Sequence, residues 1–166
     1  MTTLPQLLVD IDARVQSIRE NRPDWLCGKG CDGCCKRLAE VPQLTAEEWS
    51  LLREGLAVLP SERIGEISRE MSILTDHESG PVICPLLDRA TGACSVYVQR
   101  PAACRTYGFY VQRDKGLYCR EIEIRVDEGA LTDVVWGNHD AIDLQLNSLG
   151  KTRALTEWFG LWDNEE

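Results

Sequence analysis

The sequence predicts a mainly helical α+β fold, with a small irregular sheet and a cysteine-rich loop region. Apolar residues recur at three- and four-residue steps near both ends of the chain, which is typical of amphipathic helices. Between residues 80 and 120 this periodicity gives way to Gly, Pro and short apolar runs. Four of the eight cysteines fall within nine positions, in the stretch CGKGCDGCC at residues 27–35.

The first helix is predicted to end before Pro23, because proline disfavours helical backbone in the residue that precedes it. One stripe carries its apolar residues, which are Leu7, Leu8, Ile11, Val15 and Ile18. The glycines of the cysteine-rich loop that follows allow a tight curl that aims several side chains at one point.

Two further helices are predicted between the first and the second group of cysteines. The helix over 45–57 begins with a Thr45–Glu48 capping box, and Leu44 and Trp49 are placed as a hydrophobic staple. Its buried face comprises Trp49, Leu52 and Leu56. For the helix over 61–76, Ser61 is the predicted cap. The buried stripe of that helix is Ile64, Ile67, Met71 and Leu74.

The middle of the chain is predicted to hold the irregular sheet. We expect an extended piece at 82–84, a turn at Thr91–Gly92, and a short helix that opens at Pro101 and ends at Gly108. Apolar and charged residues alternate over 122–126, which predicts a half-buried strand. Residues 131–136 are expected to pair with it.

The C-terminal part is predicted to hold two helices, one capped by Asn138 and one after Gly150. The apolar stripes are Ile142, Leu146 and Leu149 in the first, and Ala154, Leu155, Trp158, Phe159 and Trp162 in the second. No linker divides the chain, so we expect a single domain over 1–166, with a cysteine-cluster core at about 27–120 and helical flanks. Its 166 residues are enough to bury a core without staples.

The charge balance argues against nucleic acid and anionic membranes as partners. The net charge is −9 and the sequence pI is about 4.8, whereas both partners demand a basic face. The N-terminus has neither a basic segment nor an apolar run of signal-peptide type, and no window is apolar for long enough to span a bilayer. We therefore expect a cytoplasmic protein; a protein partner stays unknown.

The eight cysteines predict a metal site. In a secreted protein an even number would indicate disulfides, but in a reducing compartment it indicates metal ligation or redox chemistry. The candidate ligands are Cys27, Cys31, Cys34, Cys35, Cys84, Cys94, Cys104 and Cys119. Thiolate-rich sites select zinc, copper(I) or iron–sulfur clusters. Adjacent Cys34 and Cys35 are awkward ligands for one tetrahedral ion and favour two neighbouring metals, or one ligand beside a redox-active thiol.

Other catalytic sites find little support. A cysteine nucleophile needs a histidine partner, and His77 and His139 are the only histidines; His139 is better placed to lie at a helix start. Phosphate-binding glycine motifs are absent.

Two functions remain. The first is a module that binds, delivers or assembles zinc or an iron–sulfur cluster. The second is a redox enzyme or maturation factor that transfers electrons or sulfur. Whether the protein is an enzyme stays open.

The spacing C-x3-C-x2-C-C, followed by ICPLL and GACSVYVQRPAACRTYG, resembles the YkgJ-type cysteine-cluster family, also described as a zinc- or iron-chelating domain. The resemblance covers about residues 27–120 and implies all eight cysteines as the chelating set. Tyr97, Arg100, Pro101 and Arg105 belong to the same motif. Arg100 and Arg105 are candidate cofactor-binding residues, because a guanidinium offsets the charge of bound thiolates and donates hydrogen bonds to sulfur. The alternative is that both pair with surface carboxylates.

Overall fold

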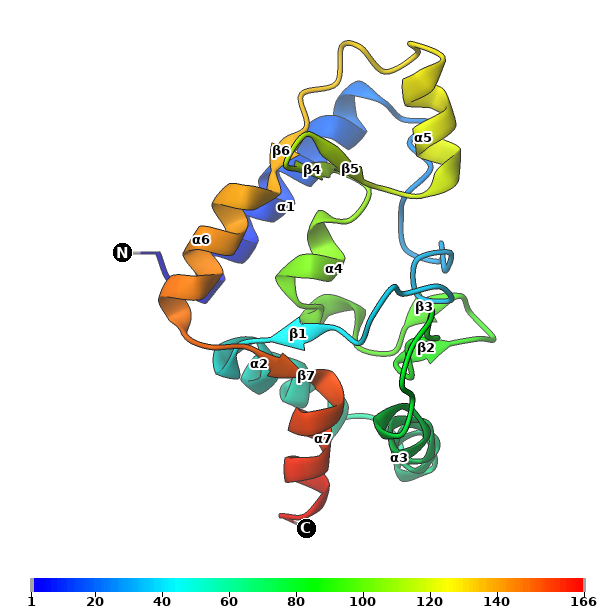
Figure 1. Ribbon diagram of the computed structural model, residues 1–166, viewed down its shortest axis with the longest axis vertical. Coiled ribbons are helices and arrows are strands. Elements are labelled where there is room, and N and C mark those ends of the chain that lie inside the picture. Colours follow the sequence, from blue (N-terminus) through cyan, green and yellow to red (C-terminus); the bar gives the residue numbers. More distant parts are fainter. Residues whose placement is uncertain (1, 166) are drawn as a thin grey trace. The chain divides into compact units, whose positions relative to one another are not determined.

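The computed structural model describes residues 2–165 and confirms the mainly helical α+β fold. Within this range the chain forms seven α-helices and small sheets of two or three strands (Figure 1). It separates into two compact units. Unit 1 comprises the chain up to Gly28 together with Ala102–Gly150, and unit 2 comprises Lys29–Pro101 together with the chain from Lys151 on. The expectation of a single domain stays a prediction.

Among residues 2–165, unit 1 has four helices, of which two contact the N-terminal one. They are α1 (Leu4–Asn21), α4 (Ala102–Thr106), α5 (Arg120–Asp127) and α6 (His139–Leu149). Helix α1 ends before Pro23 as predicted and buries its whole predicted stripe. It contacts α4 and α6, and Figure 1 shows α6 running beside it. The Asn138 side chain accepts hydrogen bonds from the Asp140 and Ala141 amides, which confirms the predicted cap of α6.

A three-stranded sheet completes unit 1. Strand β4 (Tyr110–Gln112) pairs antiparallel with β5 (Lys115–Leu117) and parallel with β6 (Gly137–Asn138). Arg113 and Asp114, with φ of 49° and 63°, form the tight turn between β4 and β5. The Tyr110 ring covers Gly137, where an added Cβ would stand 2.3 Å from the ring. Only glycine therefore lets β6 approach β4 at this point.

The strand predicted over 122–126 is wrong, because these residues form helix α5. Ile122 is buried but Ile124 is 43% exposed, so the alternating residues do not share a buried face. Glutamates in the first turn suit the positive N-terminal end of a helix, and Arg120 forms an ion pair with Glu123 one turn away. The expected pairing with 131–136 fails for the same reason, and the nearby chain pairs only at β6.

The helices of unit 2 are α2 (Ala46–Ala57), α3 (Ser61–Thr75) and α7 (Leu155–Asp163), with a 3-10 turn η1 (Tyr97–Gln99). The predicted capping box is confirmed: the Thr45 amide donates to Glu48 Oε2 at 2.9 Å and the Glu48 amide donates to Thr45 Oγ1 at 3.2 Å. The predicted Ser61 cap is wrong. Ser61 is the first helical residue, and Pro60 occupies the cap position without a side-chain hydrogen bond.

The core of unit 2 joins its helices to the cysteine-bearing strands. Strand β1 (Gln43–Leu44) pairs with β7 (Arg153–Ala154), and β2 (Leu87–Asp88) pairs with β3 (Ala93–Cys94), both antiparallel. Trp158 stacks on Trp49 and donates to the Leu44 carbonyl at 2.9 Å. The buried core residues are Leu44, Trp49, Leu52, Leu56, Ile67, Met71, Cys84, Leu86, Val96, Leu155 and Phe159. One of the eight cysteines is thus part of this apolar core.

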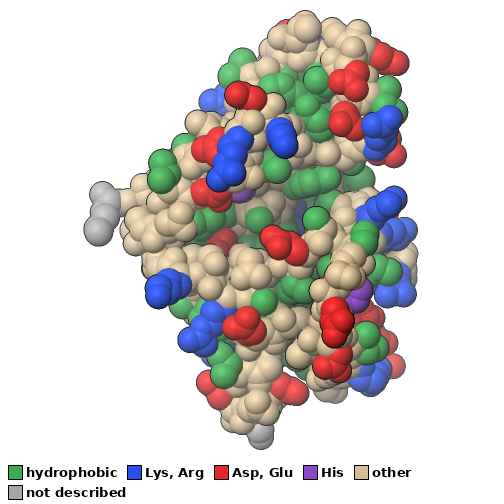
Figure 2. Space-filling view, in the orientation of Figure 1, with side chains coloured by type: hydrophobic (Ala, Val, Ile, Leu, Met, Phe, Trp, Pro, Cys, Tyr) green, Lys and Arg blue, Asp and Glu red, His purple; other side chains and the backbone are tan. Residues whose placement is uncertain are grey.

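The surface carries charges of both signs. Acidic and basic side chains are interspersed on the face drawn in Figure 2. No helix among residues 2–165 combines the length and the apolar composition that a membrane span requires.

Candidate metal centre

Two hydrogen-bonded connections bring the end of the CGKGCDGCC loop, at Cys34 and Cys35, beside Cys84 in unit 2. Leu38 and Val82 exchange backbone hydrogen bonds at 2.9 and 2.8 Å, in the extended piece predicted at 82–84. Two residues further along, the Cys84 amide donates to the Cys35 carbonyl at 2.8 Å. The chain around Cys34 and Cys35 is therefore fixed against Cys84, although two helices separate them in sequence.

The β2–β3 hairpin adds Cys94 to this group. Cys94 lies opposite Leu87 in the register of the two strands, and the Leu87 amide donates to the Cys84 carbonyl at 3.1 Å. Gly92, with φ of 72°, turns the hairpin at the predicted position. We call Cys34, Cys35, Cys84 and Cys94 the four-thiol group.

The thiols of this group influence one another's protonation. A hydrogen bond from the Cys35 thiol, opposed by burial, lowers the pKa of Cys34 to about 6. Burial raises the pKa of Cys84 to about 12, and the charges of Cys94 and Cys34 add to that effect. Burial also raises the pKa of Cys94, where the charge of Cys34 acts in the same direction. Several thiolates in this space repel one another unless a cation offsets them, which is the role of a bound metal.

Positive charge stands beside the four-thiol group. The Arg100 guanidinium lies over the Tyr97 ring, 3.7 Å from its centroid, and its Nε donates to the Tyr97 carbonyl at 2.9 Å. Its charge acts to lower the pKa of Cys34 and, against the larger effect of burial, that of Cys94. Lys29 stands 5.3 Å from the same ring. Tyr97 thus anchors two cations in unit 2.

Sequence reasoning missed Arg63, on the first turn of α3. Its side chain is 19% exposed, and its guanidinium donates to the carbonyls of Pro85 and Leu87 and to the Ser95 hydroxyl. A half-buried arginine outside the cysteine motif is hard to find by pattern. The only sequence signal is its pairing with Glu66 one helical turn later.

The other cysteine of unit 2, Cys31, is exposed. It precedes Asp32, whose carboxylate pairs with Lys36 at 2.7 Å.

Unit 1 holds Cys27, Cys104 and Cys119. The Cys27 thiol donates to the Tyr107 carbonyl at 3.6 Å and abuts Gly108, where an added Cβ would stand 2.6 Å from its sulfur. Cys104 lies on α4, which ends before Gly108 as predicted. Cys119 is the N-cap residue of α5, and burial followed by a hydrogen bond with Glu121 raises its pKa.

Aromatic rings surround this part of unit 1. Trp25 stacks on Phe109 with centroids 6.0 Å apart, and its Nε1 donates to the Gly108 carbonyl. Trp136 contacts both Trp25 and Tyr118, the residue before Cys119. The two tryptophans act as packing anchors here.

The two candidate arginines have different partners. Arg105, whose side chain is 10% exposed, donates to Asp12 Oδ2 at 2.9 Å. This is the carboxylate pairing that sequence analysis names as the alternative. Arg100 instead stands where its charge reaches two of the thiols. A cofactor-binding role for either arginine stays a prediction.

The donor chemistry of the four-thiol group suits zinc or an iron–sulfur cluster, because four thiolates complete a tetrahedral zinc site and also ligate both common cluster types. Among the residues described, no three Cys, His, Asp or Glu side chains have the spacing of a formed metal site. The backbone connections therefore bring the thiols near one another without enclosing an ion. All eight cysteines stay predicted ligands.

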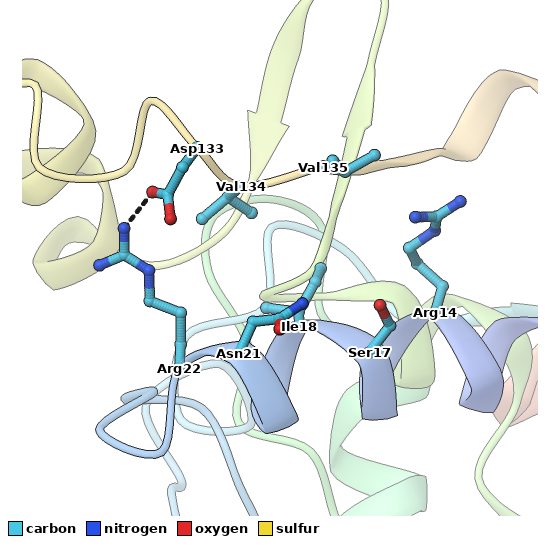
Figure 3. A pocket seen from close by; sticks show the side chains of 8 residues that line it. All are labelled: Arg14, Ser17, Ile18, Asn21, Arg22, Asp133, Val134 and Val135. Carbon is cyan, nitrogen blue, oxygen red and sulfur yellow. Dashed lines mark hydrogen bonds and ion pairs between the residues drawn. The ribbon is translucent and has the colours of Figure 1, made fainter.

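Two other features of unit 1 lie outside the cysteine set. His139 opens α6, is buried, and places Nε2 3.2 Å from Asp143; its Nδ1 has no hydrogen-bond partner within the described chain. A cavity of about 100 Å³ lies between α1 and the segment 133–135 (Figure 3). The Arg22–Asp133 ion pair borders it and lowers the pKa of Asp133. No cysteine lines this cavity.

Comparison with known proteins identifies one family. No curated protein and no solved structure matches the chain. Residues 26–123, more than half of the chain, match the CxxCxxCC family model, described as "Putative zinc- or iron-chelating domain". This description agrees with the predicted cofactors, zinc or an iron–sulfur cluster. The chain has three residues between its first two cysteines, one more than the family name implies. The match spans all eight cysteines, and the chain belongs to this cysteine-cluster family of zinc- or iron-chelating domains.

Proposed function

We propose that this protein holds zinc or an iron–sulfur cluster through its cysteine thiolates and acts as a metal-binding, delivery or assembly module. The observation that carries the proposal is the pair of backbone connections in unit 2, the Cys84–Cys35 hydrogen bond and the β2–β3 register, which bring the chain segments that bear Cys34, Cys35, Cys84 and Cys94 near one another. Four thiols of one compact unit can ligate one metal centre without ligands from elsewhere. Cys31, Cys27, Cys104 and Cys119 are the further ligands of the proposed set.

The chemistry of the surroundings supports this proposal. Four thiolates around Zn²⁺ leave a net charge of −2, and burial makes uncompensated charge costly. Arg100 supplies opposite charge beside Cys34 and Cys94. The bound group would supply a cation that keeps buried thiols such as Cys84 deprotonated, and this chain's residues would orient the sulfurs and exclude water.

The experiment is anaerobic purification followed by visible absorption and by analysis of metal and acid-labile sulfide. A colourless protein with stoichiometric zinc and no sulfide assigns zinc, and a brown protein with matching iron and sulfide assigns a cluster. A folded protein that retains eight free thiols and takes up neither would remove the proposal.

A second candidate function is electron or sulfur transfer. The observation that favours it is the adjacent Cys34–Cys35 pair, in which one thiol donates to the other and holds its pKa low. A thiolate is the nucleophilic form of cysteine, so the metal-free pair is suited to attack sulfur. A colour that dithionite bleaches reversibly would favour this candidate over zinc binding, whereas labile sulfide alone would not distinguish it from a simply bound cluster.

A further inference from the structure

Arg63 connects the two halves of the hairpin that carries Cys84 and Cys94. Its Nη2 donates to the Pro85 carbonyl at 3.1 Å and to the Leu87 carbonyl at 3.0 Å. Both Nη2 and Nε donate to the Ser95 hydroxyl at 3.1 Å. Pro85 directly follows Cys84, and Ser95 directly follows Cys94. One guanidinium is therefore bonded to the neighbours of two proposed ligands.

The paired strands of the hairpin are short, although the Ser95 amide also donates to the Leu86 carbonyl and Leu86 and Val96 are buried beside it. Strands β2 and β3 have two residues each, and an isolated two-stranded hairpin is marginally stable at best in water. Arg63 itself is fixed, because it stands on the long helix α3 and its Nη1 donates to Glu66 at 3.1 Å. It thus ties a short hairpin to a rigid element.

We propose that Arg63 is a positioning residue of the metal centre, which holds the backbones after Cys84 and Cys94 at a set separation so that both thiols are in place before metal binds. This inference rests on the function proposed above. Arg63 touches neither the metal nor a thiol in this role, and acts through the chain that bears the ligands.

The chemistry of the side chain explains why arginine stands here. A guanidinium is planar, carries five N–H donors in a fixed fork, and keeps its charge, so it can bond three acceptors on the two sides of the hairpin at once. A lysine ammonium offers three donors at one point and cannot span the same acceptors. The charge of Arg63 also opposes the effect of burial on the pKa of Cys94.

The test compares Co²⁺ and Zn²⁺ affinity, by chelator competition, between the wild type and the full-length variants Arg63→Met and Arg63→Lys. Loss of a residue that supports metal ligands typically lowers metal affinity by about 10–100-fold. We expect a loss in that range for Arg63→Met and nearly as large a loss for Arg63→Lys, with the number of bound ions unchanged. The Co²⁺–thiolate absorption bands should also broaden or shift. The control is Arg69→Gln, an exposed arginine on the same helix, which should match the wild type.

A second readout separates positioning from general stability. In metal-free protein, amide hydrogen exchange at Ser95, which donates to the Leu86 carbonyl at 2.7 Å, should accelerate in Arg63→Met, while exchange in α7 stays unchanged. Unchanged metal affinity in both variants would overturn the inference alone and leave the proposed function standing. A fall in melting temperature with an unchanged affinity would likewise overturn it. A wild type that binds no Co²⁺ through thiolates would instead remove the proposed function, and this inference with it.

Discussion

The two units hold their cysteines in different ways. In unit 2, backbone hydrogen bonds connect the loop at Cys35 to Cys84, and Cys84 to the strand opposite Cys94. In unit 1, Cys27 lies against Gly108 beneath a cluster of aromatic rings, and Cys119 caps a helix. The first arrangement brings four potential ligands together, whereas the second offers three thiols within its unit. We therefore expect unit 2 to be the part that completes a four-thiolate site by itself.

The largest expected effect is a difference in metal affinity between a cysteine variant of unit 2 and one of unit 1. Structural zinc contributes roughly 10–16 kcal/mol, so one of four ligands accounts for about 3 kcal/mol, or about a hundredfold in affinity. We expect Cys84→Ser to lower the affinity of the most tightly held metal by about that factor, and Cys119→Ser to leave it nearly unchanged. Elemental analysis and chelator competition measure both. Equal losses in the two variants would mean that Cys84 and Cys119 serve one centre, and would contradict the expectation that unit 2 holds this metal by itself.

A packing change offers the next largest effect, this time in unit 1. Gly108 has φ of 96°, a conformation that costs other residues about 1–2 kcal/mol, and an added Cβ would also meet the Cys27 sulfur. Overpacking adds about 1–3 kcal/mol, so Gly108→Ala should destabilise the protein by roughly 2–5 kcal/mol in chemical denaturation. Gly160→Ala is the matched control, because no atom lies within 4 Å of its added Cβ. Metal bound by the four-thiol group should survive Gly108→Ala; its loss would show that the cysteines of unit 1 support that site.

Thiol reactivity in metal-free protein tests the electrostatic side of the comparison. With its pKa lowered to about 6, Cys34 is largely thiolate at pH 7, whereas burial and Glu121 raise the pKa of Cys119 above its ordinary value. A thiolate of low pKa is intrinsically less nucleophilic, which offsets part of the advantage that Cys34 has from its larger thiolate fraction. We therefore expect iodoacetamide to modify Cys34 only about tenfold faster than Cys119 at pH 7. Both rates should fall at pH values below about 6, where Cys34 is also protonated, and the excess of Cys34 should shrink as pH rises above 7, because Cys119 then ionises while Cys34 is already thiolate. Mass spectrometry of digests reports both sites, and equal rates at pH 7 would contradict the proposed hydrogen bond.

The sequence predicts a helix correctly where a single local pattern, such as an apolar stripe or a capping box, specifies it. The apolar stripe of α1 and the Thr45–Glu48 capping box are each complete within a few residues, so they can be read without knowing the fold. Helix α5 was mispredicted because its sequence fits both periods. Ile122 and Val126 are four residues apart, as on a helix face, and the same residues alternate with charges as in a strand. Which residues are buried distinguishes the helix from the strand, and burial depends on how the rest of the chain packs.

In the candidate site, too, the sequence predicts local features but not contacts between distant segments. Cysteine content and spacing predict which residues bear the chemistry, and the family match covers all eight. The grouping of Cys34 and Cys35 with Cys84 depends on a backbone hydrogen bond between distant segments, which no spacing reveals. Arg63 is likewise defined by three acceptors that only the folded hairpin presents together.

The smallest expected effects come from the two arginines of the cysteine motif, which should separate binding from stability. Arg105→Gln removes an ion pair with the half-exposed Asp12 and should cost about 1 kcal/mol of stability while leaving metal affinity unchanged. Arg100→Gln should do the reverse, because it removes positive charge beside Cys34 and Cys94 and should lower metal affinity by about tenfold. Denaturant unfolding measures the stability of the two variants, and chelator competition measures their metal affinity. If Arg105→Gln instead weakened metal binding as much as Arg100→Gln does, Arg105 would act on the centre in spite of its carboxylate partner, and charge compensation would not be confined to unit 2.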